Sequence, residues 1–249
     1  MAIREILLPL VSYPVAVEEA AIKKSVSVAA HLDAQITAVS FEVDSRPLGG
    51  SYTRPFPTDG LTIETPEHKQ SLVSAEQMMA VFDTAARDFG IGYRKTIKRC
   101  VPEDFSSYLA FCARTFDLSL VPIRSFDAMH EKVVEELIFQ SGRPLLIFSV
   151  GMADRLPSSF DHAAIAWDHS QQATRAIADA MWLLQNAKTV RVFTATDNET
   201  SAERESGEAL IKHLAAHGIK ALFETIPKKA ASTGRSSKLM SKITRSIFS

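Results

Sequence analysis

The sequence AAIAWDHSQQATRAIADAMWLLQNAKTVRVFTATD, residues 163–197, contains a short apolar run, a polar turn, an amphipathic segment and a second run rich in β-branched residues. This order predicts a strand, a helix and a second, parallel strand, as in a βαβ unit. Residues 3–44, IREILLPLVSYPVAVEEAAIKKSVSVAAHLDAQITAVSFEVD, have the same order. Repetition at this distance predicts two copies of one domain in tandem and not a solenoid of short repeats.

The first half of the chain contains a complete set of alternating elements. The expected strands cover residues 6–10, 36–41, 93–101, 118–123 and 145–150, and the third is polar enough for an edge strand. The expected helices cover residues 15–31, 71–89, 103–115 and 128–140, with Val15 and Val73 among their apolar positions. This alternation predicts an α/β fold with a doubly wound, five-stranded parallel sheet of the Rossmann-like type.

The second half contains only part of that pattern. Strands are expected at 162–167, 189–194 and 219–226, and helices at 171–185 and 201–217. The predicted organisation is therefore a domain at 1–150, a linker at 151–161, a partial second copy at 162–226 and a basic C-terminal tail at 227–249. Residues 44–70 are rich in Pro and Gly and predict a long surface loop. Two alternatives are open for Tyr52 and Phe56 in this loop: they anchor an irregular loop to the domain, or they cover a cleft.

Composition indicates an ordinary soluble protein. The chain of 249 residues has 46% hydrophobic and 23% charged residues and a net charge of −1, which gives no reason to expect nucleic acid or a membrane as a partner. No apolar run is long enough to span a bilayer, and no signal peptide is evident, so a cytoplasmic location is expected. Cys100 and Cys112 have no metal-ligand spacing and are expected to be reduced thiols.

Several motifs of the chain resemble the universal stress protein family. They are the run LLPL followed by a helix and ITAVSF, then DLSLVPI, and above all VVEELIFQSGRPLLIFS. The second copy's AIAWDHSQQATRAIADA resembles the opening of that family more closely than the first copy does. The resemblance covers residues 3–150 as a complete domain and 162–226 as a partial one. It implies strand order 3-2-1-4-5 and a ligand site beyond the carboxyl ends of the strands.

ATP-binding members of that family have an aspartate at the end of the first strand. They also have a glycine-rich G-x-x-G…G-[ST] loop after the fourth strand, where backbone amides approach the phosphates. In the first copy Val11 stands at the aspartate position, and no glycine occurs between Gly92 and Gly142. Glu131 and Lys132 stand where the last Gly-Ser would be. Arg124 and Lys132 can attract an anion, but solvated structural roles are expected for them.

In the second copy, Asp168 and Ser170 match the family's opening and are the candidate nucleotide-binding residues. The alternative for Asp168 is a helix cap or a plain turn before the helix at 171–185. His162 and His169 flank the first strand of this copy, and their spacing favours solvated or capping roles over a metal site. No nucleophile–base set and no metal site is predicted.

Two functions remain open. The first is a non-catalytic stress-response or regulatory protein with a degenerate nucleotide site and no cofactor, which acts by protein interaction. The second is an adenine-nucleotide-binding stress protein, or a weak ATPase, with ATP bound near Asp168. The incomplete second copy leaves the strand at 163–167 uncovered on one side, which predicts a homodimer or another cover. Basic residues and the apolar positions 239, 243 and 247 in the tail favour a loosely docked terminus over membrane or nucleic-acid binding.

Overall fold

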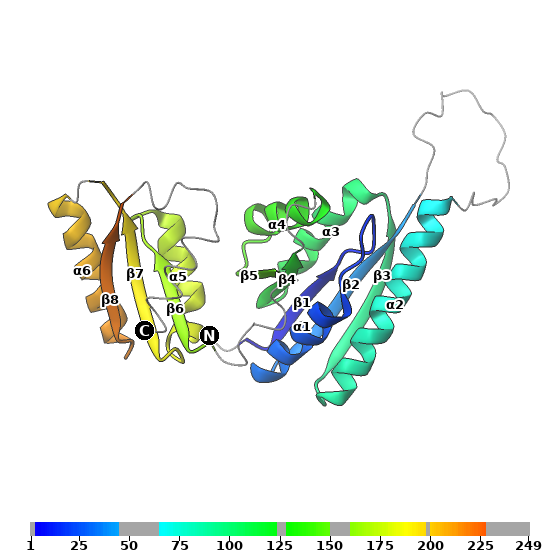
Figure 1. The fold of residues 1–249 in the computed structure, drawn as a ribbon, viewed down its shortest axis with the longest axis horizontal. Coiled ribbons are helices and arrows are strands. Elements are labelled where there is room, and N and C mark those ends of the chain that lie inside the picture. The colour runs from blue at the N-terminus through cyan, green and yellow to red at the C-terminus, as the bar shows by residue number, and fades with distance from the viewer. Residues whose placement is uncertain (1–2, 45–64, 124–127, 150–159, 198–199, 228–249) are drawn as a thin grey trace, which may run out of the picture. The chain divides into compact units, whose positions relative to one another are not determined.

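The computed structural model describes residues 3–44, 65–123, 128–149, 160–197 and 200–227 (Figure 1). The chain divides into two compact units, one of Ile3–Ser158 and one of Ser159–Ser249 with Met1–Ala2. The sequence-based expectations for Tyr52, Phe56 and Arg124, for residues 151–159 of the linker and for residues 228–249 of the tail lie outside the described residues.

The first unit contains the predicted five-stranded parallel sheet. The strands run in the order β3-β2-β1-β4-β5, which confirms both the fold class and the edge position of the polar strand. Strand β1 is central and its apolar side chains are buried on both faces, as expected for a parallel sheet covered by helices. The strands are β1 Glu5–Leu10, β2 Gln35–Val43, β3 Tyr93–Cys100, β4 Leu118–Ile123 and β5 Leu145–Ser149.

Four helices cover this sheet as two neighbouring pairs. Helix α1 packs beside α2 and α3 beside α4, and the two pairs lie on opposite sides of the sheet (Figure 1). Phe41 of β2 and Phe105 of α3 are both fully buried, and their ring centroids lie 4.3 Å apart. This contact packs α3 against the sheet. The helices are α1 Glu19–His31, α2 Pro66–Asp88, α3 Pro102–Ala113 and α4 Ala128–Gln140.

Two helices begin at positions other than those predicted. Helix α1 starts at Glu19 and not at residue 15, because Val17 N donates to Val11 O at 3.2 Å and holds the preceding residues in a turn. Val15 is therefore 39% exposed. Helix α2 starts at Pro66 and not at residue 71, because the Thr65 hydroxyl caps it by accepting from His68 N.

One assignment to a buried helix face was wrong. Val73 of α2 is 51% exposed, whereas Met78, Met79 and Phe82 of the same helix are buried. Val73 does not lie on the stripe that these residues form, so its side chain points to solvent. The other predicted helix and strand boundaries differ from the observed ones by two residues at most.

The second unit contains a three-stranded parallel sheet in the order β6-β7-β8. Its strands are β6 His162–Ala166, β7 Thr189–Ala195 and β8 Ala221–Ile226, and its helices are α5 Gln171–Leu184 and α6 Ser201–Ala216. The core includes Ile165, Ile177, Val192 and Leu214. Within the described residues β6 pairs with β7 alone, so the first strand of this unit is an edge strand, as the incomplete pattern predicted.

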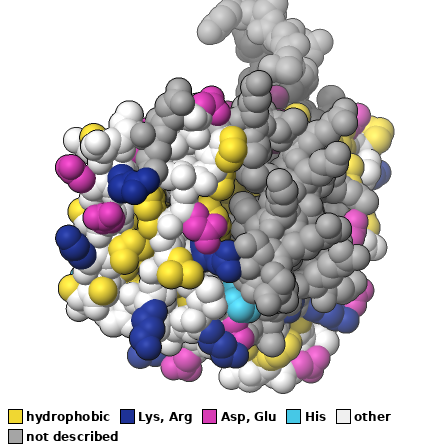
Figure 2. Space-filling view, turned by 60° about the vertical axis from the view of Figure 1, so that its left-hand side comes forward, with side chains coloured by type: hydrophobic (Ala, Val, Ile, Leu, Met, Phe, Trp, Pro, Cys, Tyr) yellow, Lys and Arg dark blue, Asp and Glu magenta, His cyan; other side chains and the backbone are white. Residues whose placement is uncertain are grey.

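The surface has charges of both signs. On the face shown in Figure 2, lysine and arginine side chains alternate with aspartate and glutamate, and apolar side chains lie between them. Among the helices that the structure describes, none is both long and apolar enough to cross a lipid bilayer.

Candidate functional site

The candidate site is a cleft of about 770 Å³ in the second unit. It lies at the carboxyl ends of β6 and β7, beside the first turns of α5 and α6, where ligands bind in open α/β sheets. Asp168 and Ser170, the two candidate residues from the sequence, both line it. The cleft is also lined by Trp167, His169, Phe193, Thr194 and Glu203.

Asp168 and Ser170 have separate roles in the turn that leads into α5. The Ser170 hydroxyl caps the helix by accepting from Ala173 N at 3.0 Å. Asp168 Oδ1 accepts from Ser170 N at 3.0 Å and so shapes the turn before the cap. His169, between them, has a φ of 66°, which the tight turn requires. Of the two structural alternatives for Asp168, a turn is correct and a cap is wrong, because Ser170 is the cap.

The hydrogen bonds from Ser170 also affect the ionisation of Asp168. They stabilise the carboxylate and lower the pKa of Asp168 below its ordinary value. Asp168 is therefore negatively charged at neutral pH. Its carboxylate gives this wall of the cleft a fixed negative charge.

A second carboxylate reaches the cleft from α6. Glu203 forms a reciprocal capping box with Thr200: Glu203 Oε2 accepts from Thr200 N at 2.8 Å, and Thr200 Oγ1 accepts from Glu203 N at 3.2 Å. Sequence reasoning missed this residue. The signal was present as the pattern T-x-x-E at residues 200–203.

The aromatic wall of the cleft is held in place by polar contacts. Trp167 Nε1 donates to Ser206 Oγ at 3.1 Å, and Thr194 Oγ1 donates to Trp167 O at 2.9 Å. The His169 ring stacks on the indole with centroids 5.8 Å apart.

Within the described part of the chain, no three His, Cys, Asp or Glu side chains are grouped as metal ligands. His162 lies on β6, opposite Thr189 of β7.

The corresponding end of the first unit has a smaller cleft of about 420 Å³. Val11, at the family's aspartate position, is only 1% exposed and does not line it. Lys132 Nζ donates to the Glu103 carbonyl at 3.1 Å, so this cation already has an acceptor inside the protein. Glu131 lies exposed in the first turn of α4. The lining residues are Pro14, Pro102, Glu103, Ala128, Met129 and Lys132.

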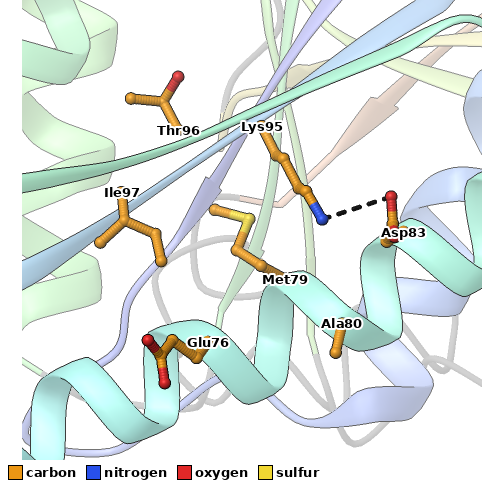
Figure 3. Close-up of a pocket in the computed structure, with 7 residues that line it drawn as sticks. All are labelled: Glu76, Met79, Ala80, Asp83, Lys95, Thr96 and Ile97. Atoms are coloured by element: carbon orange, nitrogen blue, oxygen red, sulfur yellow. Dashed lines mark ion pairs between the residues drawn. The ribbon is translucent and has the colours of Figure 1, made fainter.

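A third pocket, of about 500 Å³, lies between α2 and the edge strand β3 (Figure 3). Two of its charged groups form a pair: Lys95 Nζ lies 3.4 Å from Asp83 Oδ1, and the Tyr93 hydroxyl also donates to Asp83. The hydrogen bond from Tyr93 lowers the pKa of Asp83. Paired charges beside an edge strand protect it from pairing with another chain, so we assign this pocket a structural role.

Comparison with known proteins gives a likeness in fold. No known family profile matches the sequence, and no curated protein matches it. The structure is similar to a universal stress protein from Archaeoglobus fulgidus, with a TM-score of 0.65 and 14% identity over 94% of this chain and 81% of that chain. The structure is also similar to a Pseudomonas aeruginosa protein described as a universal stress protein, with a TM-score of 0.50 and 16% identity over 96% of this chain and 80% of that chain. The chain therefore has the α/β fold of universal stress proteins.

Proposed function

We propose that this chain is a non-catalytic regulatory protein of the universal stress type, which acts by protein interaction. The fold likeness supports the stress-response class. The absence of nucleotide turnover is proposed from the helix N-termini at the larger cleft. Backbone N–H groups at the start of α5 donate to Asp168 and Ser170, and those at the start of α6 donate to Thr200 and Glu203.

These contacts oppose phosphate binding for two reasons. First, backbone N–H groups at a helix N-terminus are the usual donors to a phosphate, and here four of them donate to side chains of the chain itself. Second, the carboxylates of Asp168 and Glu203 line the same cleft and would repel a phosphate bound beside these helix ends. Each lost charge-assisted hydrogen bond is worth about 1.5–3 kcal/mol, so the loss of several weakens binding by orders of magnitude.

The sequence of the first unit also predicts weak ATP binding. It has Val11 in place of an acceptor for the adenine amine and Glu131 in place of a glycine. A carboxylate near a phosphate site repels the ligand, and this repulsion is stronger in a cleft than in open water. We therefore expect neither unit to bind ATP tightly or to turn it over.

Protein interaction is supported by apolar side chains that the first unit leaves exposed. In the described residues β5 pairs with β4 alone, and Ile147 of β5 is 38% exposed. On the helices Phe111 is 66% and Phe139 72% exposed. Exposed apolar surface beside an open sheet edge is typical of an interface. We propose a homodimer that includes the β5 edge.

Light scattering tests the homodimer. The wild-type chain is expected to give twice the chain mass at micromolar concentration, and Ile147→Lys to give the chain mass. Val73→Lys is the matched control, because Val73 is similarly exposed but lies on α2. A monomeric wild type, or an Ile147→Lys variant that stays dimeric, would refute this interface.

Adenine-nucleotide binding at Asp168 is the second candidate. It is favoured by one observation: the cleft of about 770 Å³ has the size of a small-molecule site and an aromatic wall at Trp167. Calorimetry with Mg·ATP on nucleotide-free protein distinguishes the two candidates. Binding weaker than about 1 mM supports the regulatory protein, whereas low-micromolar binding that Asp168→Ala abolishes would replace it with the nucleotide-binding one.

A further inference from the structure

We propose that the cleft of the second unit binds a flat organic cation, and that it discriminates against anionic ligands of the same shape. This proposal goes beyond the regulatory function, which assigns no ligand to the cleft. It also differs from the nucleotide-binding candidate in the charge of the ligand. It rests on the charges, the aromatic wall and the helix caps of the cleft.

The charges of the lining have one sign. Asp168 and Glu203 are acidic, and no lysine or arginine occurs among the described residues that line the cleft. Two arginines of the same unit are paired with other carboxylates: Arg175 with Asp179 at 3.0 Å, and Arg191 with Glu224 at 3.2 Å. The lining therefore attracts a cation and offers an anion no counter-charge.

The aromatic wall suits a flat ring. Trp167 and Phe193 both line the cleft, and the indole is fixed by its hydrogen bond to Ser206. An indole face attracts organic cations through its quadrupole, more strongly when water is excluded. The volume of about 770 Å³ is large enough for a ligand of the size of a nucleoside.

The helix caps add discrimination against anions. At the α5 end, the amides of Ser170 and Ala173 donate to Asp168 and Ser170, and at the α6 end those of Thr200 and Glu203 donate to each other's side chains. An anion would have to displace these side chains before it could reach the amides. A cation needs no such rearrangement, because it is attracted by the carboxylates as they stand.

The test uses one ring system in several charge states: 1-methyladenosine, which is cationic, adenosine, which is neutral, and AMP and ATP, which are anionic. Calorimetry on the full chain is expected to give affinities that fall in that order, with 1-methyladenosine at least tenfold tighter than ATP. Raising the salt concentration is expected to narrow this difference, because salt screens exposed charges.

Two conservative variants locate the binding. Asp168→Asn keeps an acceptor for the Ser170 amide, and Glu203→Gln keeps the capping box, so both remove charge and preserve the turns. Each is expected to weaken 1-methyladenosine at least threefold and to leave adenosine within twofold. Glu208→Gln is the control, because this exposed acidic residue of α6 does not line the cleft.

Three results would overturn the proposal. They are ATP binding as tight as that of 1-methyladenosine, no 1-methyladenosine binding at about 10 mM, and equal effects of the cleft and control variants. These failures are distinguishable from a failure of the regulatory function. If none of the four compounds binds, the cation site is refuted and the regulatory proposal stands. If ATP binds tightly, both proposals are refuted.

Discussion

The substitution Gly207→Ala tests how closely α6 approaches the sheet of the second unit. Gly207 lies inside this helix, and a Cβ added there would lie 2.3, 2.4 and 2.6 Å from three ring atoms of Phe223 on β8. These distances are far below van der Waals contact, so either the ring or the helix must move. Since α6 also supplies Glu203 to the cleft and the Ser206 hydroxyl that holds Trp167, its position against β8 affects the geometry of the site.

Two effects of opposite sign determine the outcome. Replacing a helical glycine by alanine stabilises an exposed helix by about 1 kcal/mol, because the unfolded chain loses freedom. Overpacking a well-packed position costs about 1–3 kcal/mol. The Phe223 ring is partly buried and packs against the core cluster of this unit, so the destabilising effect of overpacking is expected to exceed the gain in helix propensity. We expect Gly207→Ala to lower the free energy of unfolding by about 1 kcal/mol.

Urea denaturation followed by tryptophan fluorescence measures this effect in the second unit alone, because both tryptophans, Trp167 and Trp182, belong to it. Phe223→Leu combined with Gly207→Ala is expected to cost less than the sum of the single changes, since the smaller side chain makes room for the Cβ. The control Ala209→Gly, on the exposed face of α6, measures helix propensity alone. A Gly207→Ala variant more stable than the wild type would refute the close approach.

Three further predictions concern the first unit. Val11→Asp is expected to lower its stability by several kcal/mol in urea denaturation followed by far-UV circular dichroism, because the site is 1% exposed and the carboxylate would be buried unpaired, whereas Val15→Asp, at 39% exposure, is expected to be nearly neutral. Burial raises the pKa of Cys100 to about 11, so its thiol stays protonated at pH 7, and mass spectrometry should show alkylation that accelerates as the pH rises towards 11. Asp117→Ala removes the acceptor of Arg4 N at 2.9 Å and Glu5 N at 3.1 Å, and a loss of about 1–3 kcal/mol in the same denaturation assay is expected; an unchanged midpoint would contradict it.

The strands of the first unit could be predicted because their signals are local and strong, whereas their order followed only from the resemblance to universal stress proteins. Strand β1 is a continuous apolar run, which only a sheet covered on both faces can bury, and β3 is polar, which only an edge tolerates. The helix starts could not be predicted as well. The start of α1 depends on the hydrogen bond from Val17 N to Val11 O, which no sequence pattern indicates. The start of α2 depends on the cap residues Thr65 and Pro66. These two residues lie in a segment whose Pro and Gly content predicted a loop.

The candidate site was predicted in part. Asp168 and Ser170 were located through their resemblance to the opening motif of universal stress proteins, and the structure places them in the turn between β6 and α5. Which of them caps the helix depends on the backbone at His169, whose positive φ no pattern indicates. Glu203 comes from a different element, and only the packing of α6 brings its carboxylate to the same cleft as Asp168.

We infer that neither unit has a complete nucleotide site, which is why neither is expected to bind ATP. In this fold the adenine acceptor follows the first strand and the phosphate loop follows the fourth, and both must stand at the same end of one sheet to reach one ligand. The first unit has the fourth strand, β4, but Val11 is buried where the acceptor belongs. The second unit has Asp168, but β6 has no partner beside β7 among the described residues. An acceptor without donors for phosphate selects a ligand by its ring and its positive charge, which is the chemistry that the cleft around Asp168 and Trp167 offers.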